Sequence, residues 1–245
     1  MKIKNILINI FLLLIRIIDY KNKKKIIFFL KKKFKSQPLN IIDIGAHEGE
    51  SIDIFIKNFN IKKIYSFEPN INLFKKLTQK YDRINNKIIL FNCGLGKKEE
   101  VKPLNIMVDS SSSTFNTIDE NSAYFKRKQK IFNIFFKSKN IIKKQQEIKI
   151  EKLSNIIKNQ SINKIDLLKI DTEGFEYNIL RGIQNEDFKK IQYIYFEHHY
   201  DLMIKKGYKF SDINFFLRNR NFTPKYKLKM NLRKSFEYIY ENSEK

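Results

Sequence analysis

The chain has 245 residues, of which 49 are Lys or Arg and 26 are Asp or Glu, so its formal net charge is +23. This length is enough for one domain with a single substantial core. A lone cysteine, Cys93, excludes an internal disulfide and a cysteine cluster for zinc. We therefore expect a reducing cytoplasm as the compartment and a packing role for Cys93.

The high positive charge has two interpretations. Clustered lysines attract nucleic acid or an anionic membrane. Lys, Asn, Ile and Phe are all abundant, however, and all have codons made mainly of A and T, so a biased genome would produce this composition whatever the protein binds. The aromatic residues lie inside apolar runs more often than between lysines, so we do not expect a base-stacking surface or a nucleic-acid partner.

Residues 1–39 form a basic and apolar segment that we expect to be helical. Its apolar run Ile6–Ile15 is followed by a basic run, Lys21–Lys25. The apolar run is too short to span a bilayer, and no small-residue cleavage site follows it. Two alternatives remain open: a helix docked on the domain, or an interfacial helix whose lysines meet anionic headgroups. A second apolar cluster followed by lysines, Ile26–Leu30, is a point in favour of the interfacial alternative. The protein is expected in the cytoplasm, and a peripheral membrane contact belongs to the interfacial alternative.

A single domain is predicted over residues 40–245, and it opens with the segment Ile41–Gly49. This segment reads as an apolar strand, an acid and then glycines, and a helix is predicted after it over Glu50–Phe59, with an apolar stripe formed by Ile52, Phe55, Ile56 and Phe59. A strand that ends in glycines brings a backbone turn close to a ligand, and the next helix points free N–H groups at it. The pattern indicates a nucleotide-like cofactor, although it departs from Gly-x-Gly-x-x-Gly.

A second strand, Ile61–Phe67, ends in Glu68, where a nucleoside-binding sheet places a carboxylate for two ribose hydroxyls. Pro69 cannot extend the strand and suits the turn into a helix over Asn70–Tyr81. Asn70 is a plausible cap of that helix, and one face carries Ile71, Phe74 and Leu77. Lys87–Cys93 is the third predicted strand.

This alternation of strands and helices predicts a parallel sheet with helices on both faces, which binds ligands outside the carboxyl ends of its strands. Asp43, Glu68 and Asn92 each end one of three successive strands. We therefore expect these three side chains to converge on one crevice.

An insertion is predicted over residues 109–146. It follows an irregular strand or hairpin, Glu99–Val108, and begins with the polar loop Asp109–Thr114, which could be a flexible linker. The rest of the insertion is mixed and basic, and it could be a lid or a surface insertion. A short strand, Ile148–Ile150, and a helix, Lys152–Ile157, follow it.

The second half of the chain completes the predicted sheet. We expect core strands at Asn163–Ile170 and Ile191–Glu197, helices at Gly174–Gly182 and Phe210–Arg220, and an edge strand at Phe236–Tyr240.

Four motifs in this order resemble those of FkbM-type methyltransferases: Asp43–Gly49, Phe67–Pro69, Asn92–Gly96 and Leu168–Glu176. The last, which contains Lys-Ile-Asp-x-Glu-Gly-x-Glu, is the most specific. The resemblance covers Ile41 to His199. It implies an α/β, Rossmann-like class I methyltransferase fold, with a mostly parallel central sheet and an antiparallel C-terminal edge, that uses S-adenosylmethionine to methylate a hydroxyl, usually on a sugar or a natural product.

The resemblance assigns most of the motif residues to the cofactor. Asp43 would orient the turn or meet the methionine part, His47 stands where the family often has asparagine, and Glu68 would bind the ribose. The expected cofactor-binding residues are Asp43, Gly45, His47, Gly49, Glu68, Asn92, Cys93, Gly94 and Asp171.

Methylation of a hydroxyl needs a group that takes its proton. Asp171 is the first candidate because it ends the fourth core strand, although it could instead cap a helix or hold the cofactor's ammonium. Glu173 and His198 are the other catalytic candidates; Glu173 could simply stabilise a helix start, and His198 could be a polar loop residue. A divalent metal held by Asp171 and Glu197 is an alternative that we do not expect. Glu176 is expected to be solvated or to face the sheet.

The acceptor that we expect is a saccharide or a lipid-linked glycan precursor at the cytoplasmic membrane face. The alternative is an RNA-directed methyltransferase or a nucleic-acid-binding module that uses the basic surface, although the chain lacks an aromatic RNA-binding motif and an Asn-Pro-Pro-Tyr strand end. The absence of Gly-x-Gly-x-x-Gly argues against a nicotinamide oxidoreductase. Substrate loops vary while a cofactor sheet persists, so neither the acceptor nor the oligomeric state follows from the sequence.

Overall fold

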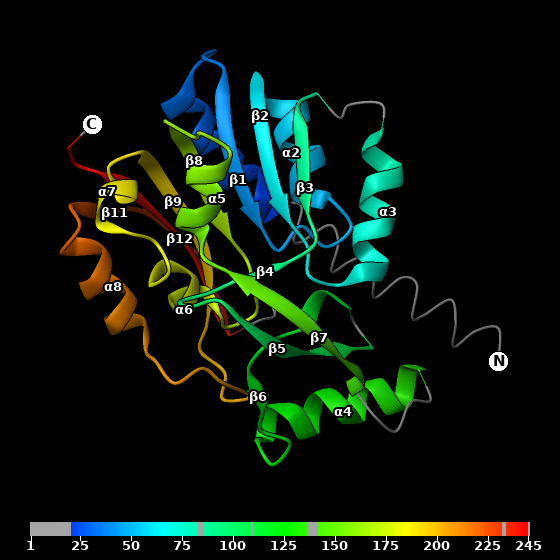
Figure 1. Cartoon of the computed structure of the whole chain (residues 1–245). Coiled ribbons are helices and arrows are strands. Elements are labelled where there is room, and N and C mark those ends of the chain that lie inside the picture. Colours follow the sequence, from blue (N-terminus) through cyan, green and yellow to red (C-terminus); the bar gives the residue numbers. More distant parts are fainter. Residues whose placement is uncertain (1–20, 83–85, 109, 137–141, 232–233, 245) are drawn as a thin grey trace.

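The computed structural model describes residues 21–82, 86–108, 110–136, 142–231 and 234–244. The expectations for the apolar run Ile6–Ile15 lie outside the described residues. Figure 1 shows a central sheet with helices on both faces and a smaller sheet beyond one end of its strands.

The central sheet has seven strands in the order β11-β12-β9-β8-β1-β2-β3. Neighbouring strands among β9, β8, β1, β2 and β3 run parallel, whereas β12 is antiparallel to both β9 and β11. This confirms the predicted fold class, including the antiparallel C-terminal edge. The strands are β1 (Leu39–Ile44), β2 (Ile61–Phe67), β3 (Ile88–Phe91), β8 (Ile165–Ile170), β9 (Ile191–His199), β11 (Phe222–Lys229) and β12 (Ser235–Asn242).

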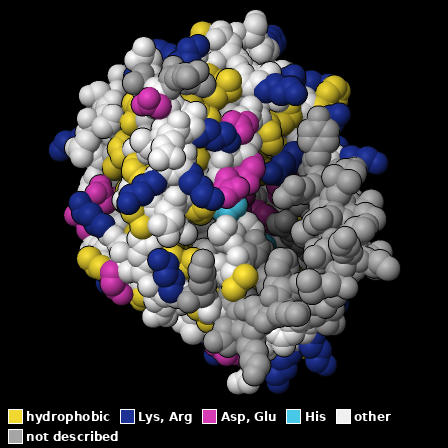
Figure 2. Space-filling view, turned by 90° about the vertical axis from the view of Figure 1, so that its right-hand side faces the viewer, with side chains coloured by type: hydrophobic (Ala, Val, Ile, Leu, Met, Phe, Trp, Pro, Cys, Tyr) yellow, Lys and Arg dark blue, Asp and Glu magenta, His cyan; other side chains and the backbone are white. Residues whose placement is uncertain are grey.

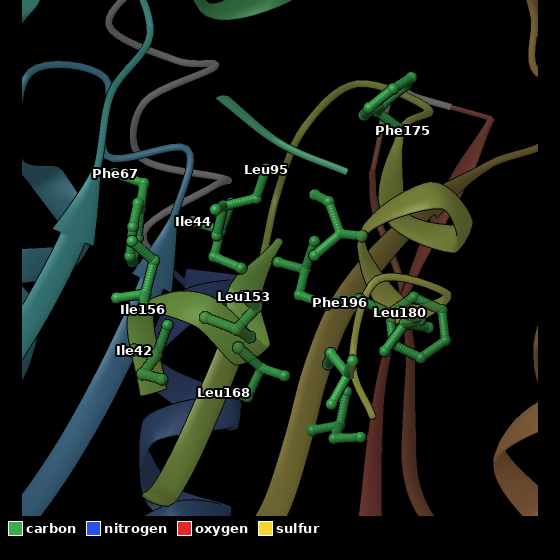
Figure 3. Packing of buried hydrophobic residues seen from close by; sticks show 14 of the residues in the cluster. Ile42, Ile44, Phe67, Leu95, Leu153, Ile156, Leu168, Phe175, Leu180 and Phe196 are labelled. Atoms are coloured by element: carbon green, nitrogen blue, oxygen red, sulfur yellow. The ribbon is translucent and has the colours of Figure 1, made fainter. Parts of the chain in front are cut away.

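Alternate residues of the central strands enter two separate apolar cores. Ile42 and Ile44 of β1 face the first core, and Ile41 faces the second. The first core, part of which Figure 3 shows, is covered by α5 (Leu153–Asn159), α6 (Glu176–Leu180), α7 (Asn185–Phe188) and α8 (Phe210–Arg218). The second is covered by a helix over residues 21–34, by α2 (Glu50–Asn58) and by α3 (Ile71–Tyr81). Burial on both faces explains why these strands are almost continuously apolar.

The helix over residues 21–34 is docked on the sheet. Ile26, Leu30 and Phe34, spaced four residues apart, are almost completely buried in the second core. The ring of Phe29 stacks on Tyr226 of β11, with 4.9 Å between centroids. None of the helices in the described ranges is long and apolar enough to cross a membrane.

Two predicted helix faces differ in detail from the structure. Ile56 of α2 was expected to face the sheet, but it lies at the margin of the apolar stripe and is 37% exposed. On α3, Leu73 and Tyr81 are buried together with the predicted Leu77, whereas Ile71 and Phe74 are only half-buried. The Tyr81 hydroxyl donates hydrogen bonds to Gly49 O and Asp53 Oδ1, and these bonds orient α3. Asn70 caps α3 as predicted by accepting from Asn72 N.

The predicted insertion contributes to a second, three-stranded sheet in the order β4-β7-β5. Its strands are β4 (Gly94–Leu95), β5 (Glu100–Met107) and β7 (Ile142–Glu151), so the expected short strand Ile148–Ile150 is part of a longer one. A 3-10 turn, η2 (Ser110–Ser112), the short strand β6 (Thr117–Ile118) and α4 (Ala123–Phe136) lie between β5 and β7. β6 pairs with β10 (Ile204–Lys205) from the C-terminal half. In Figure 1 this unit lies beyond the carboxyl ends of the central strands.

The C-terminal strands correct one prediction. The segment Phe236–Tyr240 was expected at the edge of the sheet, but it belongs to β12, which lies between β9 and β11. The outermost strand is β11, for which no strand was predicted. Lys225, Lys227 and Lys229 are exposed along β11, and Pro224 interrupts its pairing register, as is typical of an edge strand.

Candidate functional site

The turn after β1 lies close to the end of β8. Gly45 and Gly49 have φ values of 85° and 87°, and His47 has a φ of 51°. The N–H groups of Gly45 and Ala46 both donate to Phe67 O at 3.0 Å. A Cβ atom on Gly45 would lie 1.9 Å from the carbonyl oxygen of Asp171. Glycine is therefore required here because the ends of two neighbouring strands meet.

Asp43 lies beneath this turn and is completely buried. Its Oδ2 atom accepts hydrogen bonds from Ser51 Oγ at 2.6 Å and Ser66 Oγ at 3.2 Å. Its Oδ1 atom is 3.2 Å from the ammonium of Lys169. These contacts fit the turn-orienting alternative of the prediction.

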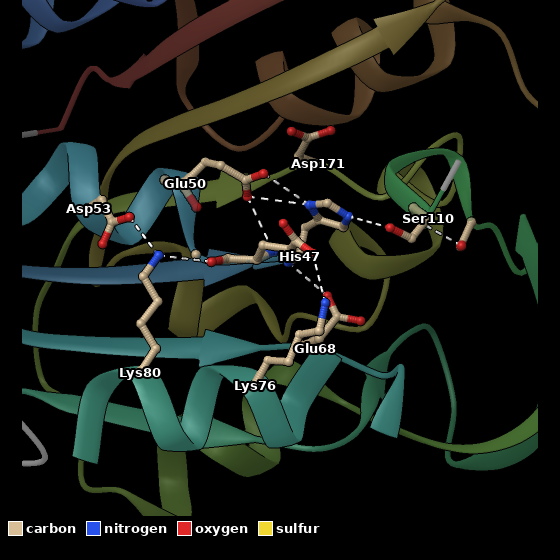
Figure 4. Close-up of polar contacts among 12 residues, drawn as sticks. His47, Glu50, Asp53, Glu68, Lys76, Lys80, Ser110 and Asp171 are labelled. Carbon is tan, nitrogen blue, oxygen red and sulfur yellow. Dashed lines mark hydrogen bonds and ion pairs between the residues drawn. The ribbon is translucent and has the colours of Figure 1, made fainter. Parts of the chain in front are cut away.

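Glu68 joins the glycine turn to the start of α3. Its Oε2 atom accepts from His47 N and its Oε1 atom accepts from Asn70 N, both at 2.8 Å, as Figure 4 shows in part. Burial raises the pKa of this carboxyl to about 7, although the two N–H groups oppose that shift. Each carboxylate oxygen keeps a second acceptor position, which is what a pair of ribose hydroxyls needs.

His47 connects the glycine turn to the insertion. Its Nε2 atom lies 2.7 Å from Ser110 Oγ of η2, and its Nδ1 atom lies 3.1 Å from Glu50 Oε1. Burial lowers the pKa of His47, but Glu50 and other nearby carboxylates outweigh burial, so the pKa lies above its ordinary value. Ser110, in the polar loop that could be a flexible linker, thus contacts the glycine turn.

An apolar hollow lies beside the turn. It is lined by Ile44, Gly45, Phe67, Pro69, Cys93, Gly94, Leu95, Phe115, Thr172, Phe175 and Ile179. Asn92 Nδ2 braces its rim by donating to the carbonyl oxygens of Glu68 and Pro69. Burial raises the pKa of Cys93 to about 12, so its thiol is a packing group, as predicted. The hollow has a volume of about 20 Å³, roughly that of one water molecule, so it is an apolar wall beside the carboxylate rather than a preformed pocket for a ring.

Glu176 organises the turn after β8 and is completely buried, so it is not solvated. Its Oε1 atom accepts from Gly174 N at 2.9 Å and from the backbone and hydroxyl of Thr172. Its Oε2 atom accepts from the Tyr208 hydroxyl at 2.6 Å. The turn places Glu173 and Gly174 at φ values of 50° and 94°, and for this reason α6 begins only at Glu176 instead of Gly174.

The insertion holds the same turn from the other side. Thr114 Oγ1 donates to Glu173 O at 2.8 Å, and Asn116 Nδ2 donates to Gly174 O at 2.7 Å. Sequence reasoning did not identify Thr114, Asn116 or Tyr208. The only signal was the polar loop Asp109–Thr114, which contains Thr114 and ends two residues before Asn116, since the partners of both residues lie about 60 residues further along the chain.

Asp171 ends β8 with a side chain that is 41% exposed. The ammonium of Lys169 lies 3.5 Å from Asp171 and 3.2 Å from Asp43, so one buried cation serves both carboxylates. Burial lowers the pKa of Lys169, but the two carboxylates outweigh burial and raise it above its ordinary value. Lys169 was not among the predicted site residues, although it stands inside the motif that carried the resemblance.

Glu173 contacts a buried histidine at the end of β9. His199 Nε2 is 3.4 Å from Glu173 Oε2 and 3.7 Å from Glu197 Oε1, and His199 Nδ1 is 3.6 Å from Asp201 Oδ2. Burial lowers the pKa of His199, but these acids outweigh burial and raise it to about 10. Burial raises the pKa of Glu173 to about 7, although the His199 charge opposes that shift. Glu173 is thus a carboxyl that titrates near neutral pH beside a fixed imidazolium.

His198, a predicted catalytic residue, does not join this cluster. Successive residues of β9 face opposite sides of the sheet, so His199 and His198 point apart. The His198 ring packs against Tyr200, Tyr208 and Phe210, at centroid distances of 4.8, 5.8 and 5.7 Å. Burial, helped by the charges of Lys206 and His199, lowers its pKa to about 3. This geometry makes His198 a poor proton acceptor, and it is His199 that lies beside Glu173 instead.

The metal alternative finds no support in the geometry. Within the described ranges, no group of three or more His, Cys, Asp or Glu side chains has an arrangement that could hold a metal ion. Asp171 faces the ammonium of Lys169, and Glu197 faces His199.

Figure 2 shows that acidic side chains and a histidine border a hollow on one face of the molecule, while Lys and Arg side chains are spread over the other described parts of that face. Figure 4 shows Asp171 and Glu68 on two sides of His47 at one rim. Asn92 also contacts the backbone of Glu68, whereas Asp43 is completely buried beneath the turn, so the predicted convergence of Asp43, Glu68 and Asn92 on one crevice is found for Glu68 and Asn92 only.

Comparisons with known proteins agree with this geometry. The family model described as "Methyltransferase FkbM domain" matches residues 43–224. A search of curated protein sequences found no match. The structure is similar to that of M. capricolum TrmK in complex with S-adenosyl-homocysteine, at 10% identity and a TM-score of 0.50, over 86% of this chain and 65% of that one. It is also similar to a FkbM methyltransferase from Methylobacillus flagellatus KT, at 17% identity and a TM-score of 0.49, over 84% and 44%. This chain thus spans less than two thirds of the length of either protein. The similarity to TrmK supports the assignment of the fold.

Proposed function

The chain belongs to the family of FkbM methyltransferases, and from that premise we propose that it transfers a methyl group from S-adenosylmethionine to a hydroxyl of a saccharide or glycan precursor. The observation that carries this proposal is that Glu68, His47 and Asp171 lie at one rim. Glu68, the expected ribose ligand, and Asp171, the acid at the end of β8, lie on two sides of the glycine turn that contains His47.

The residues at this rim fit the cofactor. The glycine turn allows a close backbone approach, Glu68 retains acceptor positions for ribose hydroxyls, and the apolar wall beside Cys93 offers a surface for one face of the adenine. Asp171, half-exposed at the end of β8, is placed to meet the cofactor's ammonium or the acceptor. When bound, S-adenosylmethionine supplies an electrophilic methyl group on a sulfonium.

Glu173 is the residue that we assign to the proton of the acceptor hydroxyl. Its carboxyl has a pKa near 7, which suits a general base at neutral pH. The turn bonded to Glu176, Thr114 and Asn116 holds its backbone, and His199 lies beside its Oε2 atom. Asp201 lies on the other side of the His199 ring, so His199 and Asp201 position the carboxylate of Glu173.

A hydroxyl acceptor accords with the chemistry at the end of β8. This strand ends in carboxylates, which can orient a hydroxyl and take its proton, and in a buried ammonium that stabilises their charge. It does not end in the Asn-Pro-Pro-Tyr sequence expected of enzymes that methylate the amino groups of nucleic-acid bases. Saccharides offer several hydroxyls to such groups. The lipid-linked form of the acceptor is part of this proposal.

The test is to incubate the purified protein with S-adenosylmethionine labelled in the methyl group, together with glycan extracts and, separately, RNA from the source cell. Label is expected in the glycan fraction, and Glu173→Gln should remove most of it. Glu186→Gln, on the exposed surface of α7, is the matched control and should leave the label in place. Label in RNA instead of glycan would overturn the choice of acceptor. It would favour the alternative in which the net charge of +23 binds RNA.

A further inference from the structure

The outer face of the helix over residues 21–34 is formed by lysines arranged around one exposed aromatic side chain. Ile26, Leu30 and Phe34 are buried on the inner face, and Phe28 on the opposite face is 62% exposed. The exposed lysines of this stretch are Lys21, Lys24, Lys25, Lys31, Lys32, Lys33 and Lys35.

The charge on this segment has one sign. No acidic residue occurs between Tyr20 and Asp43, so the helix offers lysines without acids of its own. Lys33 turns toward Glu241 at 3.4 Å, and Lys32 lies over the ring of Phe28 at 4.4 Å from its centroid. The remaining outward lysines surround Phe28 on successive turns of the helix.

We propose that this outer face, with Phe28 at its centre, docks the protein on a bilayer surface that contains anionic lipids. Lysines around an exposed aromatic side chain match an interface where anionic headgroups meet the outer part of the acyl chains. The sequence also places the apolar run Ile6–Ile15 five residues before this helix, and apolar area near a basic face strengthens interfacial binding. The inner face is fixed by the core, so docking needs no rearrangement of the helix.

Docking in this way would bring the bilayer near the candidate active site. Lys23, in the first turn of the helix, is close enough to act electrostatically on Glu50, beside the glycine turn, and on Glu237 of β12. The first turn therefore lies at the end of the sheet that carries the site. This placement suits an acceptor held in the membrane, but the docking itself does not depend on methyl transfer.

The first test is vesicle flotation of the full chain. Vesicles of phosphatidylcholine and phosphatidylglycerol should carry the protein, pure phosphatidylcholine vesicles should not, and added salt should release it. The variant K24E/K25E/K31E/K32E should bind at least about tenfold more weakly. The control K57E/K62E/K75E/K97E changes the net charge equally at exposed lysines elsewhere and should bind like the parent chain. Equal loss in both variants would overturn the proposal, because net charge alone would then explain the binding.

The second test uses the absence of tryptophan from the chain. Phe28→Trp would be the sole tryptophan, and its emission should shift to the blue on addition of anionic vesicles. Phe215→Trp on α8, where the parent side chain is 68% exposed, should show no shift. The same result for both probes would overturn the role of Phe28. If RNA but not vesicles bound to the helix lysines, the partner would be a nucleic acid and the proposal would be wrong.

Calorimetry with S-adenosylmethionine separates this proposal from the proposed function. The lysine variants should bind the cofactor as the parent chain does, so a failure of vesicle binding leaves the methyltransferase assignment intact. A chain that binds vesicles but not S-adenosylmethionine would support membrane docking and contradict the methyltransferase assignment.

Discussion

The backbone N–H of Gly174 donates a 2.9 Å hydrogen bond to the carboxylate of Glu176, two residues further along the chain. The same carboxylate accepts from Thr172 and from the hydroxyl of Tyr208. A buried carboxylate with four donors determines the shape of the turn that presents Glu173 to the site.

Replacement of Glu176 should therefore destabilise the protein strongly. Glu176→Ala leaves the N–H of Gly174 without its buried acceptor, and we expect a loss of ~2–4 kcal/mol in the free energy of unfolding. Tyr208→Phe removes one of the four donors and should cost about 1 kcal/mol. Urea denaturation of both variants measures the difference, and equal losses would contradict the central role of Glu176.

Glu68 should control cofactor affinity. Glu68→Ala removes the acceptor for the ribose hydroxyls and the link between His47 and Asn70, so binding of S-adenosylmethionine should weaken by more than about tenfold in calorimetry. Glu186→Ala on α7 serves as the control. Unchanged affinity in a folded Glu68→Ala variant would refute the ribose assignment.

The stability of the protein should fall as the pH rises from 8 to 10. His199 has a folded pKa of about 10 against an ordinary value of 6.5, so the charged ring stabilises the fold fully below pH 6.5 and this stabilisation is lost up to about pH 10. Glu173 and Glu237, with raised pKa values of about 7 and 8, act in the same direction but lose their effect by about pH 8. Thermal denaturation of the parent chain and of His199→Gln at pH 8 and pH 10 measures the contribution of His199 to this loss of stability.

His199→Gln should show a flatter dependence of stability on pH in this range, and His198→Gln should keep the parent slope. With three histidines in the chain, ring resonances can also be followed directly by NMR. A His199 ring that titrates near its ordinary pKa would contradict the contacts with Glu173, Glu197 and Asp201.

Two glycines with positive φ should respond differently to the same change. Gly45→Ala places a Cβ atom 1.9 Å from Asp171 O and should cost ~2–4 kcal/mol or prevent folding. Gly207 has a φ of 73° but nothing within 4 Å of the added atom, so Gly207→Ala should cost only about 1 kcal/mol. Similar losses at both positions, measured by thermal denaturation, would show that backbone strain rather than the approach of β1 to β8 limits Gly45.

Local patterns determined the predictable part of this protein. The alternation of apolar strands and amphipathic helices, the glycines after β1 and the acid after β2 all depend on neighbours within a few residues. These features predicted the parallel strands and the meeting of Glu68 and Asn92 at one end of the sheet. The antiparallel C-terminal edge followed only from the family that the Leu168–Glu176 motif identified.

Contacts between distant segments decided the rest. Which of two adjacent histidines faces the site depends on the pairing register of β9, because a step of one residue reverses the face of the sheet. The side-chain partners of the turn after β8 are Thr114, Asn116 and Tyr208, and β12 lies between β9 and β11 because it pairs with both. A linear pattern carries residue type and spacing, but only the folded chain brings an acid, a histidine and a backbone turn from separate strands into contact.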